Sequence, residues 1–215
     1  MNEIPGSLLP SHATNASTVF VVDDDEAIRD SVGWLLTARK LAWQGFSSAE
    51  EFLSHYTEHG NLAGCLLLDI RMGGMSGLQL FDLLCERGCS LPTIFLTGHG
   101  DVPMAVAALK KGAFDFVEKP FHADELVQRL QQGLEQDANQ RNARAGAASV
   151  QTKLGHLSVR ERQVMDCILG GKLNKVIADE LGISMRTVEV HRARVFDKMG
   201  VRTAVELAQL LRGIV

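Results

Sequence analysis

Short, continuous apolar runs alternate with helix-like stretches over most of the first 137 residues. The runs are rich in bulky side chains, which makes them candidate strands at residues 19–22, 65–68, 93–96 and 114–117, with a fifth around residues 42–46. Runs that are apolar throughout, rather than alternating, are typical of parallel strands buried on both faces. Helical apolar spacing fills the intervals, at residues 26–38, 49–55, 77–87, 102–111 and 123–134. This order predicts an α/β fold with a doubly wound, five-stranded parallel sheet.

Particular polar residues stand where the predicted strands end. An acidic run, Asp23 to Glu26, follows the first strand, and the third, fourth and fifth strands end at Asp69, Thr97 and Lys119. Functional groups of such sheets gather at the carboxyl ends of the strands. A solvated acidic turn would explain the run after the first strand by itself. It does not explain the other three residues at matching strand ends.

The chemistry of these groups suits the transfer of a phosphoryl group to a carboxylate. Crowded carboxylates repel one another, and a hard divalent cation such as Mg²⁺, which prefers oxygen ligands, relieves that repulsion. An aspartate can attack a phosphoryl group while the cation, a hydroxyl and an ammonium bind the transferred oxygens. The set therefore predicts a site that carries an aspartyl phosphate.

The two parts of the chain differ in the sign of their charge. Residues 1–152 carry 11 Lys and Arg against 19 Asp and Glu, a net charge of −8, whereas residues 153–215 carry 11 against 7, a net charge of +4. A basic C-terminal module indicates a polyanionic partner. Residues 131–151, rich in Gln, Asn, Ala and Arg, lie between the two parts and are expected to hold a linker. Their helical propensity allows the preceding helix to continue into them before it frays.

The C-terminal part has the pattern of a run of short helices. Ser158 and Glu161 form a capping box that opens a helix towards Leu169, and further helices are expected at 174–181, from the Ser184 cap to residue 199, and from Thr203 to residue 211. Two helices joined by a tight turn that contains glycine are typical of a DNA-binding helix-turn-helix. A basic helical bundle without DNA affinity is the alternative.

The third of these helices divides into a buried stripe and an outer face. Val188, His191, Val195 and Met199 recur at helical spacing and should form the stripe, so His191 is predicted to pack rather than to bind a metal. The outer face and its flanks supply the candidate DNA contacts, with Glu189 able to accept a hydrogen bond from a cytosine amino group. These candidates are Arg186, Thr187, Glu189, Val190, Arg192, Arg194 and Lys198.

Five motifs in the first half resemble the receiver domains of bacterial response regulators. They run from Val21 to Asp25, Leu67 to Met72, Met75 to Gly77, Leu96 to Gly100 and Glu118 to Phe121. The resemblance implies a flavodoxin-like fold in which Asp69 is the phosphoacceptor. It further implies that Asp23, Asp24, Asp69 and the main-chain carbonyl of Arg71 hold Mg²⁺, while Thr97 and Lys119 contact the phosphoryl oxygens.

The same resemblance implies a conformational switch and a cis peptide. Phe116 occupies the aromatic switch position, whose ring turns inward once Thr97 moves; a plain core phenylalanine is the alternative. The bond before Pro120 is expected to be cis, since an X-Pro bond is the one peptide for which cis costs only about 0.5–1 kcal/mol. The family usually has proline where this chain has Gly73, and the Gly73-Gly74 pair is expected to loosen the loop.

The second half, from about Leu154 to Leu211, resembles the LuxR-type DNA-binding domain. The matching pieces include Leu157 to Arg162, Asn174 to Ala178 and Arg186 to His191. A receiver joined to this domain resembles the FixJ/NarL class of regulators. The resemblance implies a sensor histidine kinase as phosphoryl donor, double-stranded DNA as target and a homodimer when phosphorylated.

These expectations define four segments: a flexible leader at 1–17, a receiver at 18–137, a linker at 138–152 and a DNA-binding domain at 153–215. No apolar run is long enough to cross a bilayer and no C-x-x-C pair is present, so a cytoplasmic protein without membrane or zinc is expected. Two other functional classes fit part of the sequence. A phosphorelay module with an RNA- or protein-binding domain fits the C-terminal motif poorly. A metal-dependent phosphatase leaves the basic domain without a role, so no enzyme is predicted.

Overall fold

The computed structural model describes residues 17–98 and 102–212 of the chain. Most of the predicted leader, together with His99 and Gly100 of one receiver motif, lies outside the described residues. The chain divides into two compact units at Gln140 and Arg141, and each unit is described by itself.

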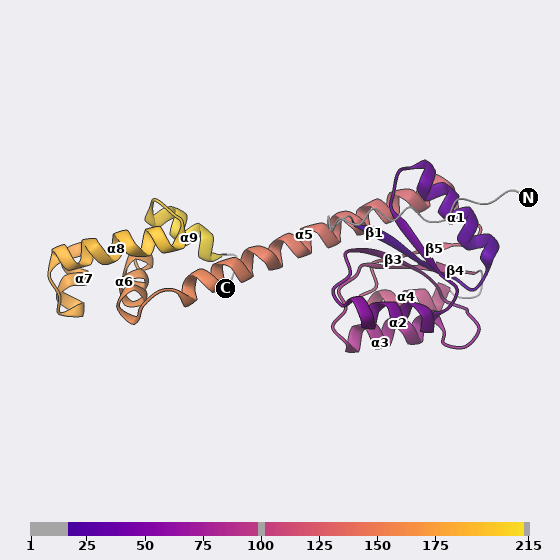
Figure 1. Ribbon diagram of the computed structural model, residues 1–215, viewed down its shortest axis with the longest axis horizontal. Coiled ribbons are helices and arrows are strands. Elements are labelled where there is room, and N and C mark those ends of the chain that lie inside the picture. The colour runs from indigo at the N-terminus through magenta and orange to yellow at the C-terminus, as the bar shows by residue number, and fades with distance from the viewer. Residues whose placement is uncertain (1–16, 99–101, 213–215) are drawn as a thin grey trace, which may run out of the picture. The chain divides into compact units, whose positions relative to one another are not determined.

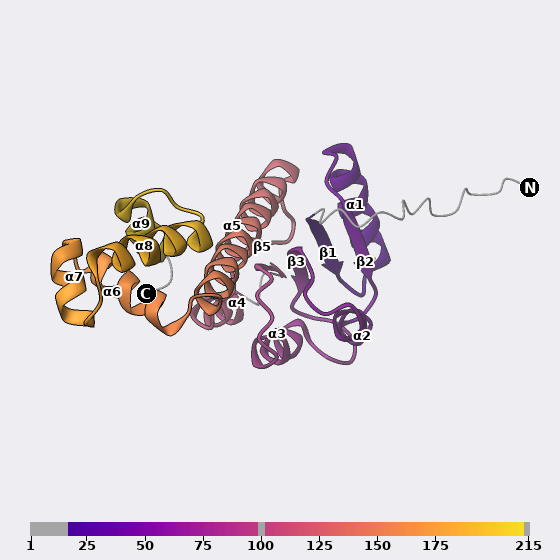
Figure 2. The same ribbon diagram turned by 60° about the vertical axis from the view of Figure 1, so that its left-hand side comes forward.

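The first unit contains a five-stranded parallel sheet in the order β2-β1-β3-β4-β5. Figure 2 shows β1 lying between β2 and β3. The strands are β1 (Thr18–Val22), β2 (Trp43–Phe46), β3 (Gly64–Asp69), β4 (Thr93–Thr97) and β5 (Asp115–Glu118). Every residue of β3 and β4 is buried, as the continuous apolar runs predicted. The predicted doubly wound α/β fold is confirmed.

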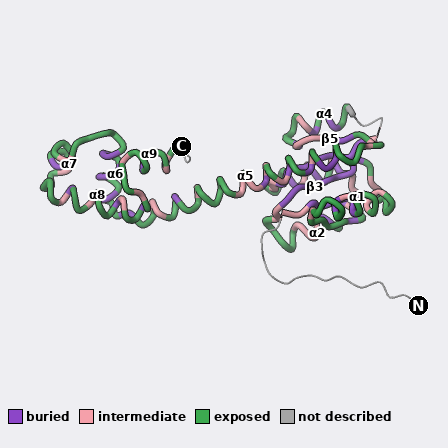
Figure 3. Tube along the Cα trace, turned by 90° about the horizontal axis from the view of Figure 1, so that it is seen from above, coloured by how far each residue is buried: buried purple, intermediate pink, exposed green. Residues whose placement is uncertain are grey.

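Helices cover both faces of the sheet (Figure 1). They are α1 (Glu26–Ala38), α2 (Ala49–His59), α3 (Gly77–Glu86), α4 (Val102–Lys110) and α5 (Ala123–Gly155). On one face, Leu36 of α1 and Leu130 of α5 pack in a cluster with Leu67 of β3. On the other, α2, α3 and α4 form a second cluster, in which Phe52 and Leu80 are fully buried. In Figure 3 the buried residues follow the strands, which places the core along the sheet.

Two helices are longer than the sequence predicted. Helix α2 continues four residues beyond residue 55, to His59, and α5 runs without a break through the predicted linker to Gly155. The sequence left a continuing helix open but expected it to fray, whereas the structure keeps residues 138–152 helical. Ala and Gln have high helical propensity, which provides the local reason.

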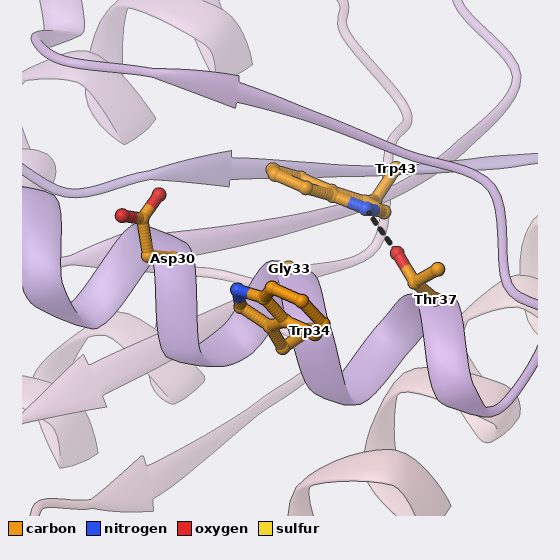
Figure 4. A pocket seen from close by; sticks show the side chains of 5 residues that line it. All are labelled: Asp30, Gly33, Trp34, Thr37 and Trp43. Carbon is orange, nitrogen blue, oxygen red and sulfur yellow. Dashed lines mark hydrogen bonds between the residues drawn. The ribbon is translucent and has the colours of Figure 1, made fainter. Parts of the chain in front are cut away.

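Helix α1 and strand β2 pack closely because Gly33 of α1 faces the Trp43 ring of β2. The Trp43 ring lies so close to Gly33 that an added Cβ would be 2.3 Å from Trp43 Cζ2, and Trp43 Nε1 donates a hydrogen bond to Thr37 Oγ1 (3.0 Å). Figure 4 shows this bond as a dashed line, with the Trp34 side chain on the same helix. Together with Asp30, these residues line a surface pocket of about 220 Å³. Trp34 is 80% exposed at its edge.

The second unit contains the predicted helices as α6 (Val159–Leu169), α7 (Asn174–Leu181), α8 (Met185–Met199) and α9 (Ala204–Arg212). The capping box of Ser158 and Glu161 is present, Ser184 caps α8, and Thr203 Oγ1 accepts a bond from the Glu206 amide. Gly182 ends α7 in the left-handed region, at a φ of +64°, which favours glycine. The buried core joins all four helices.

Candidate functional site

Three aspartates lie together at the carboxyl edge of the sheet. Strands β1 and β3 are neighbours, with Val22 opposite Leu68, so Asp23 and Asp69 come next to each other where the strands end. Oxygen atoms of Asp23, Asp24 and Asp69 lie within 4.8 Å of one another. Asp23 is 1% exposed and Asp69 is 7% exposed, while Asp24 faces solvent. Three carboxylates at this spacing, one of them open to solvent, fit the oxygen-ligand chemistry of Mg²⁺.

Lys119 joins two of these carboxylates. Its Nζ donates to Asp23 Oδ2 at 2.8 Å and to Asp69 Oδ1 at 3.0 Å. The residue directly follows β5, its amide donates to the Thr97 carbonyl (2.7 Å), and the bond to Pro120 is cis, as predicted. The β4–β5 pairing thus brings a lysine that is far away in sequence onto the β1–β3 edge.

The site has an unfavourable electrostatic balance for an ionised Asp69. Burial raises the pKa of its carboxyl, hydrogen bonding and attraction from Lys119 lower the pKa in part, and the charges of Asp23 and Asp24 raise it again. Burial lowers the pKa of Lys119, but its bonds to Asp23 and Asp69 outweigh burial and the pKa is raised. Another cation at this edge would therefore stabilise the carboxylates.

Thr97 has an unused polar atom. The residue is fully buried as the last position of β4, and its Oγ1 has no hydrogen-bond partner among the residues that the structure describes. A buried hydroxyl without a partner is costly, and Thr97 Oγ1 is able to form a further hydrogen bond. Phe116 lies opposite Phe95 in the β4–β5 register. It is half-buried against the core cluster on the sheet face that α2, α3 and α4 cover.

The loop after β3 holds the remaining predicted residues. Arg71 lies two positions after Asp69, and its carbonyl as a Mg²⁺ ligand stays a prediction. The Gly73 amide donates to Asp24 Oδ2 at 2.9 Å, and Gly74 has a φ of +81°, in the left-handed region that favours glycine. The hydrogen bond of the Gly73 amide therefore attaches the predicted glycine pair to Asp24 of the acidic cluster.

Helix α8 has the predicted division into faces. Val188, Val195 and Met199 are fully buried and His191 is half-buried, while Glu189 and Val190 are exposed. Arg186 and Arg194 are also exposed, whereas the Arg192 guanidinium lies 5.5 Å from the centre of the Phe196 ring. The Thr187 hydroxyl shares a hydrogen bond with the Ser184 hydroxyl (2.8 Å), so part of its hydrogen-bonding capacity is already taken.

Lys198 differs from the other basic candidates because its ammonium is bound inside the domain. Nζ lies 2.6 Å from Glu161 Oε2 and donates to the His156 carbonyl at 3.0 Å. The Glu161 side chain is only 4% exposed. The sequence predicts a phosphate contact for Lys198, whereas its ammonium pairs with Glu161 in the structure. The DNA contact of Lys198 stays a prediction, and it competes with this ion pair.

The amino end of α7 has a feature that the sequence did not suggest. Its cap residue, Leu173, provides no side-chain hydrogen bond, and the exposed Lys175 occupies the first turn. First-turn amides without a side-chain cap among the described residues, together with the positive end of the helix dipole, favour an anion there. The signal in the sequence is a leucine where Ser, Thr, Asp or Asn would ordinarily cap a helix.

Comparisons with known proteins agree with this geometry. The family model for the response regulator receiver domain matches residues 19–131, and that for bacterial regulatory proteins of the luxR family matches residues 155–211. The chain belongs to the response regulator family. Such regulators with a DNA-binding domain are transcription factors, and this response regulator is a phosphorylation-dependent regulator of transcription.

Relatives match this response regulator over most of its length. It is 45% identical over 195 residues to the C4-dicarboxylate transport transcriptional regulatory protein DctR of Rhodobacter capsulatus, covering 90% of this chain and 98% of the relative. It is 43% identical over 198 residues to the transcriptional regulatory protein FixJ of Azorhizobium caulinodans, covering 91% and 93%.

Solved structures of response regulators also resemble it. The response regulator StyR matches with a TM-score of 0.82 at 39% identity, covering 92% of this chain and 98% of StyR. Full-length FixJ from B. japonicum matches with a TM-score of 0.59 at 38% identity, covering 94% and 98%. Within the described residues, no helix combines the length and apolar character that a membrane span requires.

Proposed function

We propose that Asp69 is the phosphoacceptor of this regulator and that a sensor histidine kinase is its donor. The observation that carries the proposal is the Lys119 ammonium, which binds both Asp23 and Asp69 beside Asp24. One oxygen of Asp69 attacks the phosphorus of a phosphohistidine, the P–N bond breaks and the imidazole leaves with the electron pair. The product is an acyl phosphate on Asp69.

Mg²⁺ is the cation that this site would take. Asp23, Asp24, Asp69 and the Arg71 carbonyl would hold it, because all four supply the oxygen ligands that it prefers. When bound, the ion offsets the negative charge of the transferred phosphoryl group. Lys119 provides a second positive charge at the same edge of the sheet, and the unpartnered Thr97 hydroxyl provides a hydrogen-bond donor.

Phosphorylation then biases a two-state equilibrium in the receiver. A bond from Thr97 to a phosphoryl oxygen exists only in the phosphorylated state, so it favours the conformation in which Thr97 has moved. Phe116, half-buried on the neighbouring strand, turns inward in response. We propose that the change promotes a homodimer through α4, β5 and the receiver part of α5.

The dimer presents α8 to the major groove of double-stranded DNA. The exposed cations Arg186 and Arg194 contact phosphates, with Arg192 beside them, while Glu189, Val190 and Thr187 face base edges. Lys175, in the first turn of α7, adds a contact to the DNA backbone that the sequence did not suggest. The chain acts on no external substrate and works in the cytoplasm, where its DNA lies.

Phosphorylation of the full chain with labelled acetyl phosphate, or with a histidine kinase, tests the assignment. In the presence of Mg²⁺, wild type should take up label and Asp69→Asn should take up none. Asp30→Asn changes an exposed aspartate of α1 and serves as the matched control, with labelling like wild type. Stable label on Asp69→Asn at the wild-type level would overturn the proposal.

A further inference from the structure

The loop between β3 and α3 is fastened by two backbone amides to two carboxylates. The Gly73 amide donates to Asp24 Oδ2 at 2.9 Å, and the Met75 amide donates to Glu50 Oε1 at 2.9 Å. Asp24 follows β1, whereas Glu50 belongs to the first turn of α2. The loop next to Asp69 is therefore attached to two other elements at the same edge of the sheet.

What matters at position 73 is the N–H group and not the absence of a side chain. Gly73 is not among the glycines with positive φ, and an added Cβ would meet only Asp24 Oδ2, at an ordinary 3.8 Å. Gly74 is the opposite case, since its φ is +81° and an added Cβ would lie 2.9 Å from Glu50 Oε1. Alanine therefore fits at position 73 and keeps the donor. Proline at this position would lack the N–H.

The Gly73 bond leaves Asp24 able to bind a cation. The N–H occupies Oδ2, and Oδ1 has no hydrogen-bond partner among the residues that the structure describes, so it can be a ligand. Asp23 is buried and is held by the Asp25 amide (2.9 Å) and by Lys119, whereas Asp24 is exposed. An exposed carboxylate must lose rotamer freedom when it binds an ion. A hydrogen bond that fixes it beforehand lowers that cost.

We propose that Gly73 is a positioning residue for the divalent cation: its N–H orients Asp24 and so tightens the binding of Mg²⁺. The inference rests on the proposed function, because it takes Asp24 as a Mg²⁺ ligand. Loss of a hydrogen bond to a metal ligand typically costs about 10- to 100-fold in affinity. Since the exposed Asp24 is one ligand of several, the lower end of that range is expected.

Titration calorimetry of the full chain with Mg²⁺ alone tests this without any phosphoryl donor. Gly73→Pro should weaken binding by about tenfold, and Gly73→Ala, which keeps the N–H, should stay within about twofold of wild type. Binding by Gly73→Pro equal to wild type would overturn the proposal. Equal weakening in both variants would also overturn it, because backbone flexibility would then be the cause.

A second measurement does not depend on the proline variant folding. Hydrogen exchange of the Gly73 amide, followed by NMR in Mg²⁺-free solution, should be slowed in wild type and about tenfold faster in Asp24→Ala, which lacks the acceptor. Unchanged exchange would show that the bond is not formed in solution. If wild type itself bound no Mg²⁺, the proposed metal site would fail. If wild type bound it and Gly73→Pro bound it equally, only the role of Gly73 would fail.

Discussion

Lys198 Nζ lies 2.6 Å from Glu161 Oε2, and this pair joins the carboxyl end of α8 to the capping box of α6. We expect Lys198→Ala to lower the free energy of unfolding of the C-terminal unit by about 2–3 kcal/mol. Removing one partner leaves a buried charge uncompensated, and the partial exposure of the lysine reduces the cost from its full value. Urea unfolding measures the change.

The double variant Glu161→Gln, Lys198→Met is the control for this prediction. It removes both charges, so it should recover part of the lost stability. If Lys198→Ala instead kept full stability and lowered the salt slope of DNA binding by about one unit, Lys198 would be a phosphate contact after all.

The same pair predicts how stability depends on pH. The Lys198 ammonium and the Ser158 amide bind the Glu161 carboxylate and lower its pKa from 4.5 to about 2. A pKa lowered in the folded state means stabilisation that is complete above pH 4.5 and is lost as pH falls towards 2. Denaturant midpoints measured between these pH values should fall more steeply for wild type than for Glu161→Gln. Parallel curves for the two proteins would contradict the pKa assignment.

The buried Thr97 hydroxyl should stabilise the phosphorylated receiver and not the unphosphorylated one. Thr97→Val removes an oxygen that has no partner among the described residues, so stability without phosphate should be unchanged or raised, by up to about 1 kcal/mol. Sedimentation should show weaker dimerisation of this variant after phosphorylation, while Thr97→Ser, which keeps the hydroxyl, should dimerise like wild type. Normal phosphorylation-dependent dimerisation of Thr97→Val would exclude Thr97 from the switch.

Substitutions of two exposed residues of α8, Arg194 and Glu189, should change DNA binding in different ways. Arg194→Ala should weaken binding to all DNA sequences and lower the salt slope by about one unit, because an arginine near phosphates contributes through counterion release. Glu189→Ala should spare non-specific binding and relax the preference at one or two base pairs, with about 1–3 kcal/mol of discrimination at stake. Competition on randomised half-sites at two salt concentrations separates these effects. Unaltered base preferences in Glu189→Ala would make Glu189 a solvated charge.

A pair of glycine substitutions tests the packing of α1 on β2. Gly33→Ala places a Cβ 2.3 Å from Trp43 Cζ2, so the indole must leave and lose its bond to Thr37. We expect a loss of about 1–2 kcal/mol in stability and a red shift in tryptophan fluorescence. Gly146→Ala in α5, where nothing lies within 4 Å, should instead stabilise by about 0.5–1 kcal/mol. Similar effects of the two substitutions would contradict this packing.

The sequence by itself determined the order of strands and helices and the kinds of residue at the strand ends. Strand residues 65–68 and 93–96 are apolar throughout because both faces of the sheet are covered, and that pattern needs no structure to be recognised. Asp23, Asp69 and Lys119 could be grouped for the same reason: parallel strands place their carboxyl ends at one edge. The caps at Ser158 and Ser184 are likewise local signals of three or four residues.

Only the tertiary structure decided which partner each polar group takes. Lys198 and Arg194 look alike in sequence and both are exposed, yet among the described residues only Lys198 pairs with a distant carboxylate, that of Glu161, which is 37 positions away. The glycine at 73 predicted a looser loop, whereas its amide is paired with Asp24, which is 49 positions away. Hydrogen bonds and ion pairs act over about 3 Å. Which residues come that close depends on how distant elements pack, and local sequence does not contain that information.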